Sequence, residues 1–420
     1  MKKNSILFIF TLFILAWNLA CKPQKPTVEM GKYRAVLASP GGELPFEMVL
    51  SRVQNSDKIK VDVLNGKEKL GMDDAHILGD SIVIPMDIFE AKIVAKIEEN
   101  GRLIGYWQKK RSKNSFAKMN FEANLSKNET RFKNAKDSKI EVNGKWKTTF
   151  VTDNNKDTTH AIGIFEQKGA ELTGTFLTTT GDYRYLAGNI SGDSLMLSCF
   201  DGTHLYLFRA VMKDKKLIGK FWSGTSSLEN WAATKDENAT LPNATKLTYL
   251  KKGYESLAFK FPDMEGKKIA LTDKRFENKV VVVQILGSWC PNCMDESNFL
   301  APWYKKNKER GVEIVGLAYE KSSVLEEAKP RIEKMKERFG ISYPIVLAGT
   351  NDKDSASASL PMLNKILSFP TTIFIDKKGK VRQIHTGFAG PGTGKYYDEL
   401  TADFERLIDK LVAEPSPKIK

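Results

Sequence analysis

The chain has 420 residues, of which 41% are hydrophobic and 28% are charged, so its composition excludes a wholly disordered protein. At roughly 100–200 residues for each domain, this length predicts two to four domains. The net charge of +14 is compatible with a nucleic-acid or membrane-surface partner. Basic and acidic residues are interleaved, however, and the longest basic run, Lys109–Arg111, has no aromatic ladder beside it. We therefore expect no nucleic-acid partner, because such binding requires basic residues that gather on one face.

The N-terminal residues have the pattern of an export signal. Two lysines precede the apolar stretch Ile6–Ala20, which is too short to span a membrane and is typical of the hydrophobic part of a signal peptide. It ends in a small residue followed by Cys21, which resembles the lipobox of bacterial lipoproteins, although Asn18 stands where that motif usually has leucine. We predict a signal peptide over residues 1–21, lipidation at Cys21 and a membrane anchor through the lipid; a plain cleaved signal or an uncleaved anchor is the alternative. Each of these places the mature chain in the cell envelope, facing the periplasm, where disulfides can form.

Two successive segments have the pattern of β structure. Residues 22–128 contain short apolar runs separated by turn sequences such as Asn65-Gly66 and Asn100-Gly101, which favour hairpins. Residues 139–234 repeat this pattern, and the landmarks recur at offsets of 113, 113 and 114 residues: Gly31-Lys32-Tyr33 with Gly144-Lys145-Trp146, Gly79-Asp80-Ser81 with Gly192-Asp193-Ser194, and Leu103-Ile104-Gly105 with Leu217-Ile218-Gly219. This regularity predicts a duplicated all-β N-terminal region, with chance similarity among turn motifs as the alternative. The copies could form two sheets or barrels, or close one barrel between them.

The remainder of the chain predicts a linker and an α/β domain. Residues 235–252 are polar and lack periodicity, as a linker does, whereas residues 253–414 alternate strand-like and helix-like stretches. Val280–Leu286 is almost entirely apolar, as expected of a strand buried on both faces. The other expected elements are a helix over 292–310, a strand over 312–318, a helix over 322–339, a strand over 343–347, a short helix over 357–367, strands over 371–375 and 381–385, and a helix over 397–412. Such alternation predicts a sheet covered on both faces.

The cysteines indicate where the chemistry lies. Cys199 stands alone in an apolar run and is expected to be buried, so Cys290 and Cys293 form the only pair of the mature chain. A zinc site would require a second pair of Cys or His, and the four histidines are far apart, so no metal is expected. At the start of a helix, the free N–H groups and the helix dipole favour a thiolate. We therefore predict a redox pair, with Cys290 as the nucleophile and Cys293 as the resolving thiol.

At this point the sequence resembles a known family. Val280–Cys293 is similar to the active-site strand and helix of the thioredoxin superfamily, and Phe261-Pro262-Asp263 resembles the N-terminal hairpin of its TlpA/ResA-like branch. The resemblance covers about 160 residues, the third segment only. It implies a C-terminal α/β thioredoxin-like fold and a thiol–disulfide oxidoreductase that needs no metal or organic cofactor. Its partners would be protein thiols or disulfides of the cell envelope and an upstream redox donor.

The resemblance also assigns further site residues. Within Phe369-Pro370-Thr371, the proline would be cis, lie against the redox pair, and have neighbouring backbone that binds the substrate peptide. Trp289 would shield the pair, with plain packing as the alternative.

Two positions concern the proton of the resolving thiol. Gln284 stands where thioredoxins often have a buried acid, and it cannot take a proton. Glu296 matches a glutamate of the ResA-like pattern one helical turn beyond Cys293, where it could raise the pKa of that thiol or relay its proton. A solvated helix carboxylate is the alternative for Glu296.

The sequence leaves two other functions as alternatives. A peroxiredoxin-like thiol peroxidase would require Pro-x-x-x-Thr-x-x-Cys around its reactive cysteine, and Gln284–Trp289 does not supply this environment. Alternatively, the β segments could be a ligand-binding or adhesion module for which the redox domain is an accessory. The glycine-rich stretch 387–394 lacks the ending of a phosphate loop and is expected to be a loop into the last helix.

Overall fold

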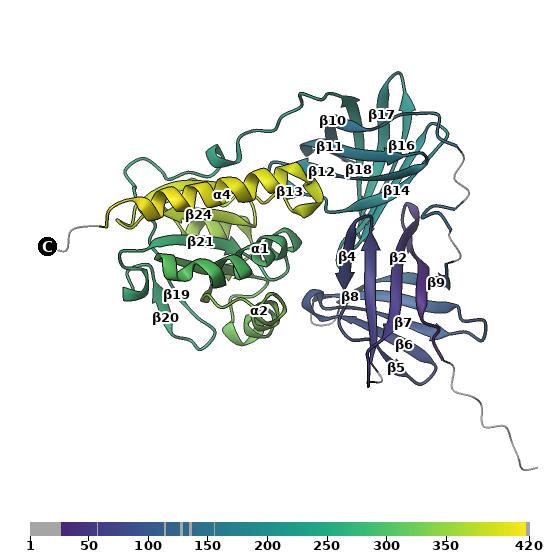
Figure 1. Ribbon diagram of the computed structural model, residues 1–420, viewed down its shortest axis with the longest axis horizontal. Helices are drawn as coiled ribbons and strands as arrows, with labels where there is room; N and C mark the ends of the chain where they lie inside the picture. Colours follow the sequence, from purple (N-terminus) through teal and green to yellow (C-terminus); the bar gives the residue numbers. More distant parts are fainter. Residues whose placement is uncertain are drawn as a thin grey trace, which may run out of the picture.

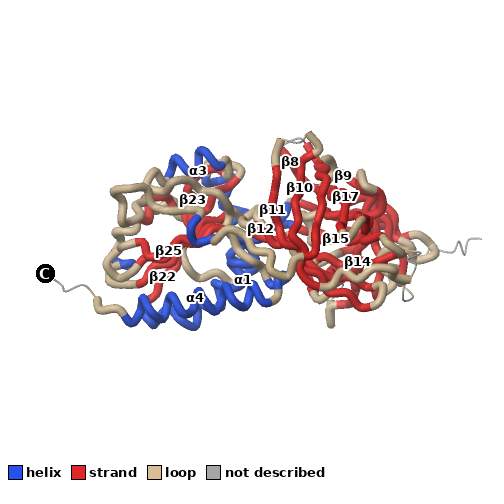
Figure 2. The backbone as a smooth tube through the Cα atoms, turned by 90° about the horizontal axis from the view of Figure 1, so that it is seen from above, coloured by secondary structure: helices blue, strands red, loops and turns tan. Residues whose placement is uncertain are grey.

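The computed structural model of the chain describes residues 27–416 except 57, 113–114, 127–128, 134–136 and 155. Two all-β units are followed by a C-terminal α/β domain, and the three parts lie against one another (Figure 1). In Figure 2 the α-helices are confined to the C-terminal domain, so the prediction of an all-β N-terminal region is confirmed. The expected signal peptide and Cys21 lie outside the described residues. Within the described part of the chain, no helix is both long and apolar enough to cross a membrane.

The first unit is a nine-stranded antiparallel sheet in the order β4-β3-β2-β1-β9-β8-β7-β6-β5. Its strands are β1 (Gly31–Ser39), β2 (Gly42–Arg52), β3 (Ile59–Asn65), β4 (Glu68–Gly71), β5 (His76–Leu78), β6 (Ser81–Met86), β7 (Ala91–Ile97), β8 (Leu103–Ser112) and β9 (Ser115–Leu125). Alternate residues of β7 are buried, because successive side chains of a strand point to opposite faces. The short 3-10 helix η1 (Asp87–Phe89) joins β6 to β7.

The second unit is a closed antiparallel barrel. Its strands are β10 (Gly144–Thr152), β11 (Thr158–Lys168), β12 (Glu171–Thr178), β13 (Gly181–Asp182), β14 (Leu186–Ser191), β15 (Ser194–Phe200), β16 (Leu205–Lys213), β17 (Lys216–Ser223) and β18 (Ser227–Lys235). The barrel closes because β11 pairs with both β10 and β12. Its interior is filled by packed aromatic rings, among them Phe150, Phe176, Phe208 and Trp231. Cys199 on β15 is completely buried beside them.

The two β units place the repeated sequence landmarks at equivalent points. Gly31 begins β1 and Gly144 begins β10, and in each unit the first strand pairs with the last. The Gly-Asp-Ser turns precede β6 and β15, and the Leu-Ile-Gly runs lie in β8 and β17. The tandem duplication itself stays a prediction.

The C-terminal domain is built on the five-stranded sheet β23-β22-β21-β24-β25, in which the first three strands are parallel. Its elements are the hairpin β19 (Lys260–Pro262) and β20 (Lys268–Ala270), the 3-10 helices η2 (Ala244–Lys246), η3 (Lys274–Phe276), η4 (Lys308–Arg310) and η5 (Pro391–Thr393), strands β21 (Val280–Leu286), β22 (Val312–Glu320), β23 (Ile345–Thr350), β24 (Thr371–Ile375) and β25 (Val381–Thr386), and helices α1 (Pro291–Asn307), α2 (Leu325–Phe339), α3 (Lys353–Ser359) and α4 (Lys395–Ala413). All seven residues of β21 are buried, so this central strand is covered on both faces.

One predicted helix lies elsewhere. A helix was expected over residues 357–367, but α3 spans Lys353–Ser359. Asp352 caps the helix by accepting the N–H of Ser355 at 2.8 Å. Pro361 follows soon after its end, and proline disfavours helical backbone at the residue before it. The helix therefore begins and ends earlier in the sequence than predicted, because Asp352 caps its start and Pro361 follows its end.

The β units and the C-terminal domain share buried surface. Ile88 of η1 is only 5% exposed and belongs to the hydrophobic core of the C-terminal domain. Around it, Glu90 of the first unit forms ion pairs with Arg331 at 2.7 Å and Lys321 at 3.3 Å. Phe200 of the second unit packs into the core of the first. The first β unit thus contacts both the C-terminal domain and the second β unit.

Candidate active site

The predicted redox pair lies where β21 gives way to α1. Cys290 is the N-terminal cap of the helix, and its sulfur accepts the backbone N–H of Cys293 at 3.4 Å. Pro291 occupies the first helical turn, where a missing N–H costs no hydrogen bond. Both cysteines are free thiols, and their exposed fractions are 6% and 0%. The pair therefore meets the free N–H groups and the positive dipole end of α1, as the sequence predicted.

The loop before β24 supplies the second wall of the site. The peptide bond between Phe369 and Pro370 is cis. The Cys290 thiol donates to the Phe369 carbonyl oxygen at 3.3 Å, and Thr371, the first residue of β24, is buried. Residues 79 positions apart in the sequence are thus in direct contact.

Trp289 joins this wall to the strand beside it. Its ring meets that of Phe369 edge to face, with 5.6 Å between the centroids. Its indole N–H donates to the Tyr319 carbonyl oxygen at 2.9 Å. The ring is therefore held in place beside the redox pair by packing and by a hydrogen bond.

Glu296 points into the protein rather than into solvent. It is only 3% exposed, and its carboxylate accepts hydrogen bonds from the hydroxyl of Thr372 and from the side-chain amide of Gln284, the latter at 2.8 Å. Burial raises its pKa to about 7, against the opposing effect of these two donors. The expectation of a solvated helix carboxylate does not fit this environment.

The resolving thiol is electrostatically linked to Glu296. Burial raises the pKa of Cys293 well above its usual value, and the neighbouring Cys290 sulfur and the Glu296 carboxylate raise it further. A thiol in such a place keeps its proton until a base removes it.

Gln284 has a part that the sequence did not reveal. From β21 its amide donates to Glu296, and its oxygen accepts the hydroxyl of Tyr343 at 2.9 Å. Gln284, which cannot take a proton, thus orients Glu296, which can. No local pattern could have indicated this pairing, because the two residues belong to different elements 12 positions apart.

A cavity of about 680 Å³ reaches the Glu296 side chain from between α1, α4 and the last two strands. Its walls combine aromatic rings with polar side chains, among them His385 and Thr372. The cavity provides space for water beside an otherwise buried carboxyl group.

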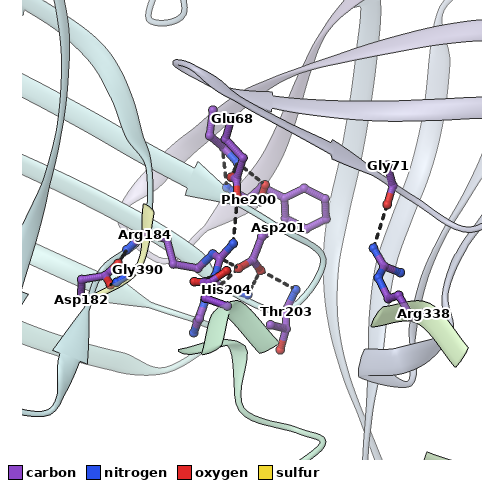
Figure 3. Close-up of polar contacts among 12 residues, drawn as sticks. Glu68, Gly71, Asp182, Arg184, Phe200, Asp201, Thr203, His204, Arg338 and Gly390 are labelled. Carbon is purple, nitrogen blue, oxygen red and sulfur yellow. Dashed lines mark hydrogen bonds and ion pairs between the residues drawn. The ribbon is translucent and has the colours of Figure 1, made fainter. Parts of the chain in front are cut away.

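A charged cluster joins the catalytic helix to both β units. Figure 3 shows Arg184 pointing towards Glu68 and Asp201, and its guanidinium lies 2.8 Å and 3.1 Å from their carboxylates. It also pairs with Asp295, two residues beyond the resolving cysteine. Burial, together with the nearby carboxylates of Asp182 and Glu68, raises the pKa of Asp295 to about 7, although Arg184 opposes this shift. Sequence reasoning missed this cluster because its members lie far apart along the chain.

Potential metal ligands do not gather anywhere in the part of the chain that the structure describes: no group of three or more His, Cys, Asp or Glu side chains has a suitable arrangement.

Comparison with known proteins adds independent information. Residues 237–400 match the Redoxin family. The thiol-disulfide oxidoreductase ResA of Geobacillus thermodenitrificans is 34% identical over 143 residues, which cover 34% of this chain and 74% of that protein. ResA of Bacillus subtilis is 30% identical over 138 residues, or 33% of this chain and 69% of the relative. A secreted thiol-disulfide isomerase from Corynebacterium glutamicum has a solved structure that is similar with a TM-score of 0.31 and 20% identity, covering 40% of this chain and 93% of that one.

Proposed function

The chain belongs to the family of ResA thiol-disulfide oxidoreductases and is an enzyme of that class, and from this we propose that it exchanges disulfides with other exported proteins through Cys290 and Cys293. The observation that carries the proposal is the pairing of two thiols at the start of α1 with the cis-proline loop, in which Cys290 lies 3.3 Å from the Phe369 carbonyl oxygen. A substrate segment bound beside Pro370 would present its sulfur to this thiol.

The exchange proceeds in two steps. The Cys290 thiolate attacks one sulfur of a substrate disulfide, so a mixed disulfide forms and the other substrate sulfur leaves as a thiolate. Cys293 then attacks the Cys290 sulfur, which forms the disulfide between Cys290 and Cys293 and releases the second substrate thiolate. Two electrons pass from the enzyme to the substrate, and an upstream thiol donor restores the dithiol. The same steps in reverse oxidise a substrate dithiol.

Glu296 acts as the base in the second step. Its pKa of about 7 lets it hold or release a proton near neutral pH, which suits general base catalysis. Ionised Glu296 takes the proton of Cys293 as that thiol attacks. The proton then leaves through the adjacent cavity, whose space admits water.

The site residues around the pair have separate tasks. Phe369, Pro370 and Thr371 form the backbone surface that receives the substrate segment, and Trp289, packed against the Phe369 ring, shields the pair. No resident metal or organic cofactor is needed, because the two thiols carry both electrons.

We place this exchange in the cell envelope, on the periplasmic side. The support is the signal-like N-terminus with its small residue before Cys21, where a lipid would anchor the chain to a membrane. An exported location suits the chemistry, because protein disulfides form and persist outside the cytosol. Protein thiols or disulfides are then the substrates, and an envelope redox donor is the partner.

The two competing functions have less support. For a ligand-binding β module, the barrel of the second unit would need open space, but its described interior is filled by aromatic rings. For a thiol peroxidase, the thiol would need the peroxide-activating residues that the sequence before Cys290 lacks.

A trapping experiment tests the proposed function. Full-length Cys293→Ser protein is mixed with a peptide disulfide, and the products are analysed by mass spectrometry after acid quenching. We expect a mixed disulfide on Cys290 that is absent from the Cys290→Ser control. Peroxide turnover that survives Cys293→Ser, with no mixed disulfide formed, would instead favour the peroxidase.

A further inference from the structure

The turn between β12 and β13 lies on the residues that surround the redox pair. The Ser368 hydroxyl, two residues before the cis proline, donates to the Thr180 carbonyl oxygen at 2.9 Å. Two glycines mark how closely the parts approach. A Cβ atom on Gly387 would lie 2.7 Å from the backbone carbonyl carbon of Thr180, and a Cβ atom on Gly181 would lie 2.4 Å from the side-chain amide nitrogen of Asn292. Asn292 stands between the two cysteines. The second β unit therefore reaches the face from which Cys290 must be approached.

Asp182 and Arg184, which follow this turn, also bind it to the C-terminal domain. The Asp182 carboxylate accepts the backbone N–H of Gly390 at 2.6 Å, and Arg184 pairs with Asp295 on the catalytic helix. Figure 3 shows the contact between Asp182 and Gly390 beside the Arg184 cluster. Three alternate residues, at 180, 182 and 184, thus contact the C-terminal domain, while Arg184 also links the segment to both β units.

The reactive thiol next to these contacts has little exposed surface. Cys290 is 6% exposed, yet exchange requires its sulfur to come within bonding distance, about 2 Å, of a substrate sulfur. A substrate segment that reached the sulfur past the proline loop would lie where Thr180 and Gly181 now lie.

We propose that Thr180–Arg184 is a self-docked segment that covers the redox pair and that a substrate segment must displace. This inference rests on the proposed exchange at Cys290 and adds the interaction surface that controls access to it.

The chemistry of the contact suits displacement. Water or a substrate backbone can replace the hydrogen bonds described above at little net cost, whereas separating the buried pair Arg184–Asp295 is the costlier part of the displacement. Domain contacts of this polar kind permit relative motion. Ile88 of the first β unit lies in the core of the C-terminal domain and keeps that unit attached to the domain when the segment leaves.

The surface also indicates which partner fits it. The position opposite the Asn292 side chain holds Gly181, which has a φ of 153° and at which a Cβ atom would lie 2.4 Å from the end of that side chain. The displacing partner is therefore an extended protein segment with a very small residue near its cysteine, as in an unfolded or flexible thiol protein.

Alkylation of Cys290 in the reduced full-length chain tests the proposal. The rate with iodoacetamide is measured against pH and assigned to Cys290 by peptide mass spectrometry. Gly181→Ala strains the turn, because the φ of 153° at this position suits glycine and the added methyl group meets the Asn292 side chain. Arg184→Gln removes the ion pair with Asp295, together with the pairs to Glu68 and Asp201. Gly169→Ala is the matched control, because that glycine also has a positive φ of 60° in a turn of the same unit but has open space around it. Arg382→Gln removes an ion pair with Glu414 from a part of the domain outside the cluster.

We expect the plateau rate at high pH to rise by about tenfold in the Gly181→Ala and Arg184→Gln proteins and to stay within about twofold in both controls, a tenfold gain matching about 1.4 kcal/mol of lost docking. Uncovering of Cys290 raises the plateau of its alkylation rate at high pH. A change in the pKa of the thiol moves only the midpoint of the pH profile, so the two effects can be told apart. Should Arg184→Gln prevent folding, Gly181→Ala alone decides, and a gain below about threefold in that protein overturns the proposal. If exchange with a peptide disulfide persists while alkylation is unchanged, only the covering segment is refuted; if no protein exchanges disulfides, the proposed function fails.

Discussion

Replacing Glu296 by glutamine should stabilise the folded protein at alkaline pH while slowing the reaction. The raised pKa means that folding disfavours the ionised carboxyl group. Below pH 4.5 the side chain is protonated in both states, and between 4.5 and about 7 the unfolded chain ionises first, so stability falls as pH rises. At roughly 1.4 kcal/mol for each pH unit, the loss amounts to about 3 kcal/mol above pH 7.

Glutamine removes this loss because it stays neutral. Its oxygen can accept the Gln284 amide, and its amide can donate to the Thr372 hydroxyl, so the hydrogen bonds can be kept. The free energy of unfolding of the variant, compared with the native chain, should therefore grow by about 3 kcal/mol between pH 4.5 and pH 8. Urea titrations at several pH values measure this difference, and the exposed Glu309→Gln provides the control.

The same variant should resolve the mixed disulfide more slowly. Loss of a general base lowers a rate by roughly 100-fold or more, and the rise of the native rate through pH 7 should disappear. Acid quenching followed by mass spectrometry gives the resolution rate. The reasoning is refuted if the stability difference does not grow with pH, or if the variant keeps the pH profile of the native enzyme.

Three further changes test the neighbouring contacts. Cys293→Ser should leave the first step intact, so that the mixed disulfide on Cys290 persists at least about 100-fold longer than in the native protein, as measured after acid quenching. Gln284→Leu removes a hydrogen-bond donor to the Glu296 carboxylate, so the pKa of that carboxyl group should move further above 7. The midpoint of the pH–rate profile should then become more alkaline, and an unchanged or more acidic midpoint would contradict the assigned hydrogen bond. Trp289→Phe loses the bond to the Tyr319 carbonyl and should lower the free energy of unfolding by about 1–2 kcal/mol in urea, whereas an unaltered stability would show that this bond contributes nothing.

Several features of the site followed from local sequence alone. The apolar strand before the pair, the proline after Cys290 and the helical pattern beyond it predicted a dithiol at a helix N-terminus, because these signals act within one or two turns of the chain. Glu296 was proposed from the resemblance to the ResA-like pattern, and its place three residues after Cys293 on a helix brings both to one side.

Other features depended on tertiary structure. The sequence resemblance suggested that Pro370 lies near the pair, but only packing brings the Phe369 carbonyl to Cys290 across 79 positions. The burial that raises the pKa of Glu296, and the amide of Gln284 that orients it, come from the sheet beneath the helix.

The sequence by itself determined the kind of chemistry, because a pair of cysteines at the start of a helix is a local arrangement. It predicted two β segments but not how they pack against the C-terminal domain. That position depends on Arg184, which joins Glu68, Asp201 and Asp295 through contacts spanning up to 116 positions. Charge pairs of this kind leave no periodic pattern in the chain, since they form only after distant elements have packed.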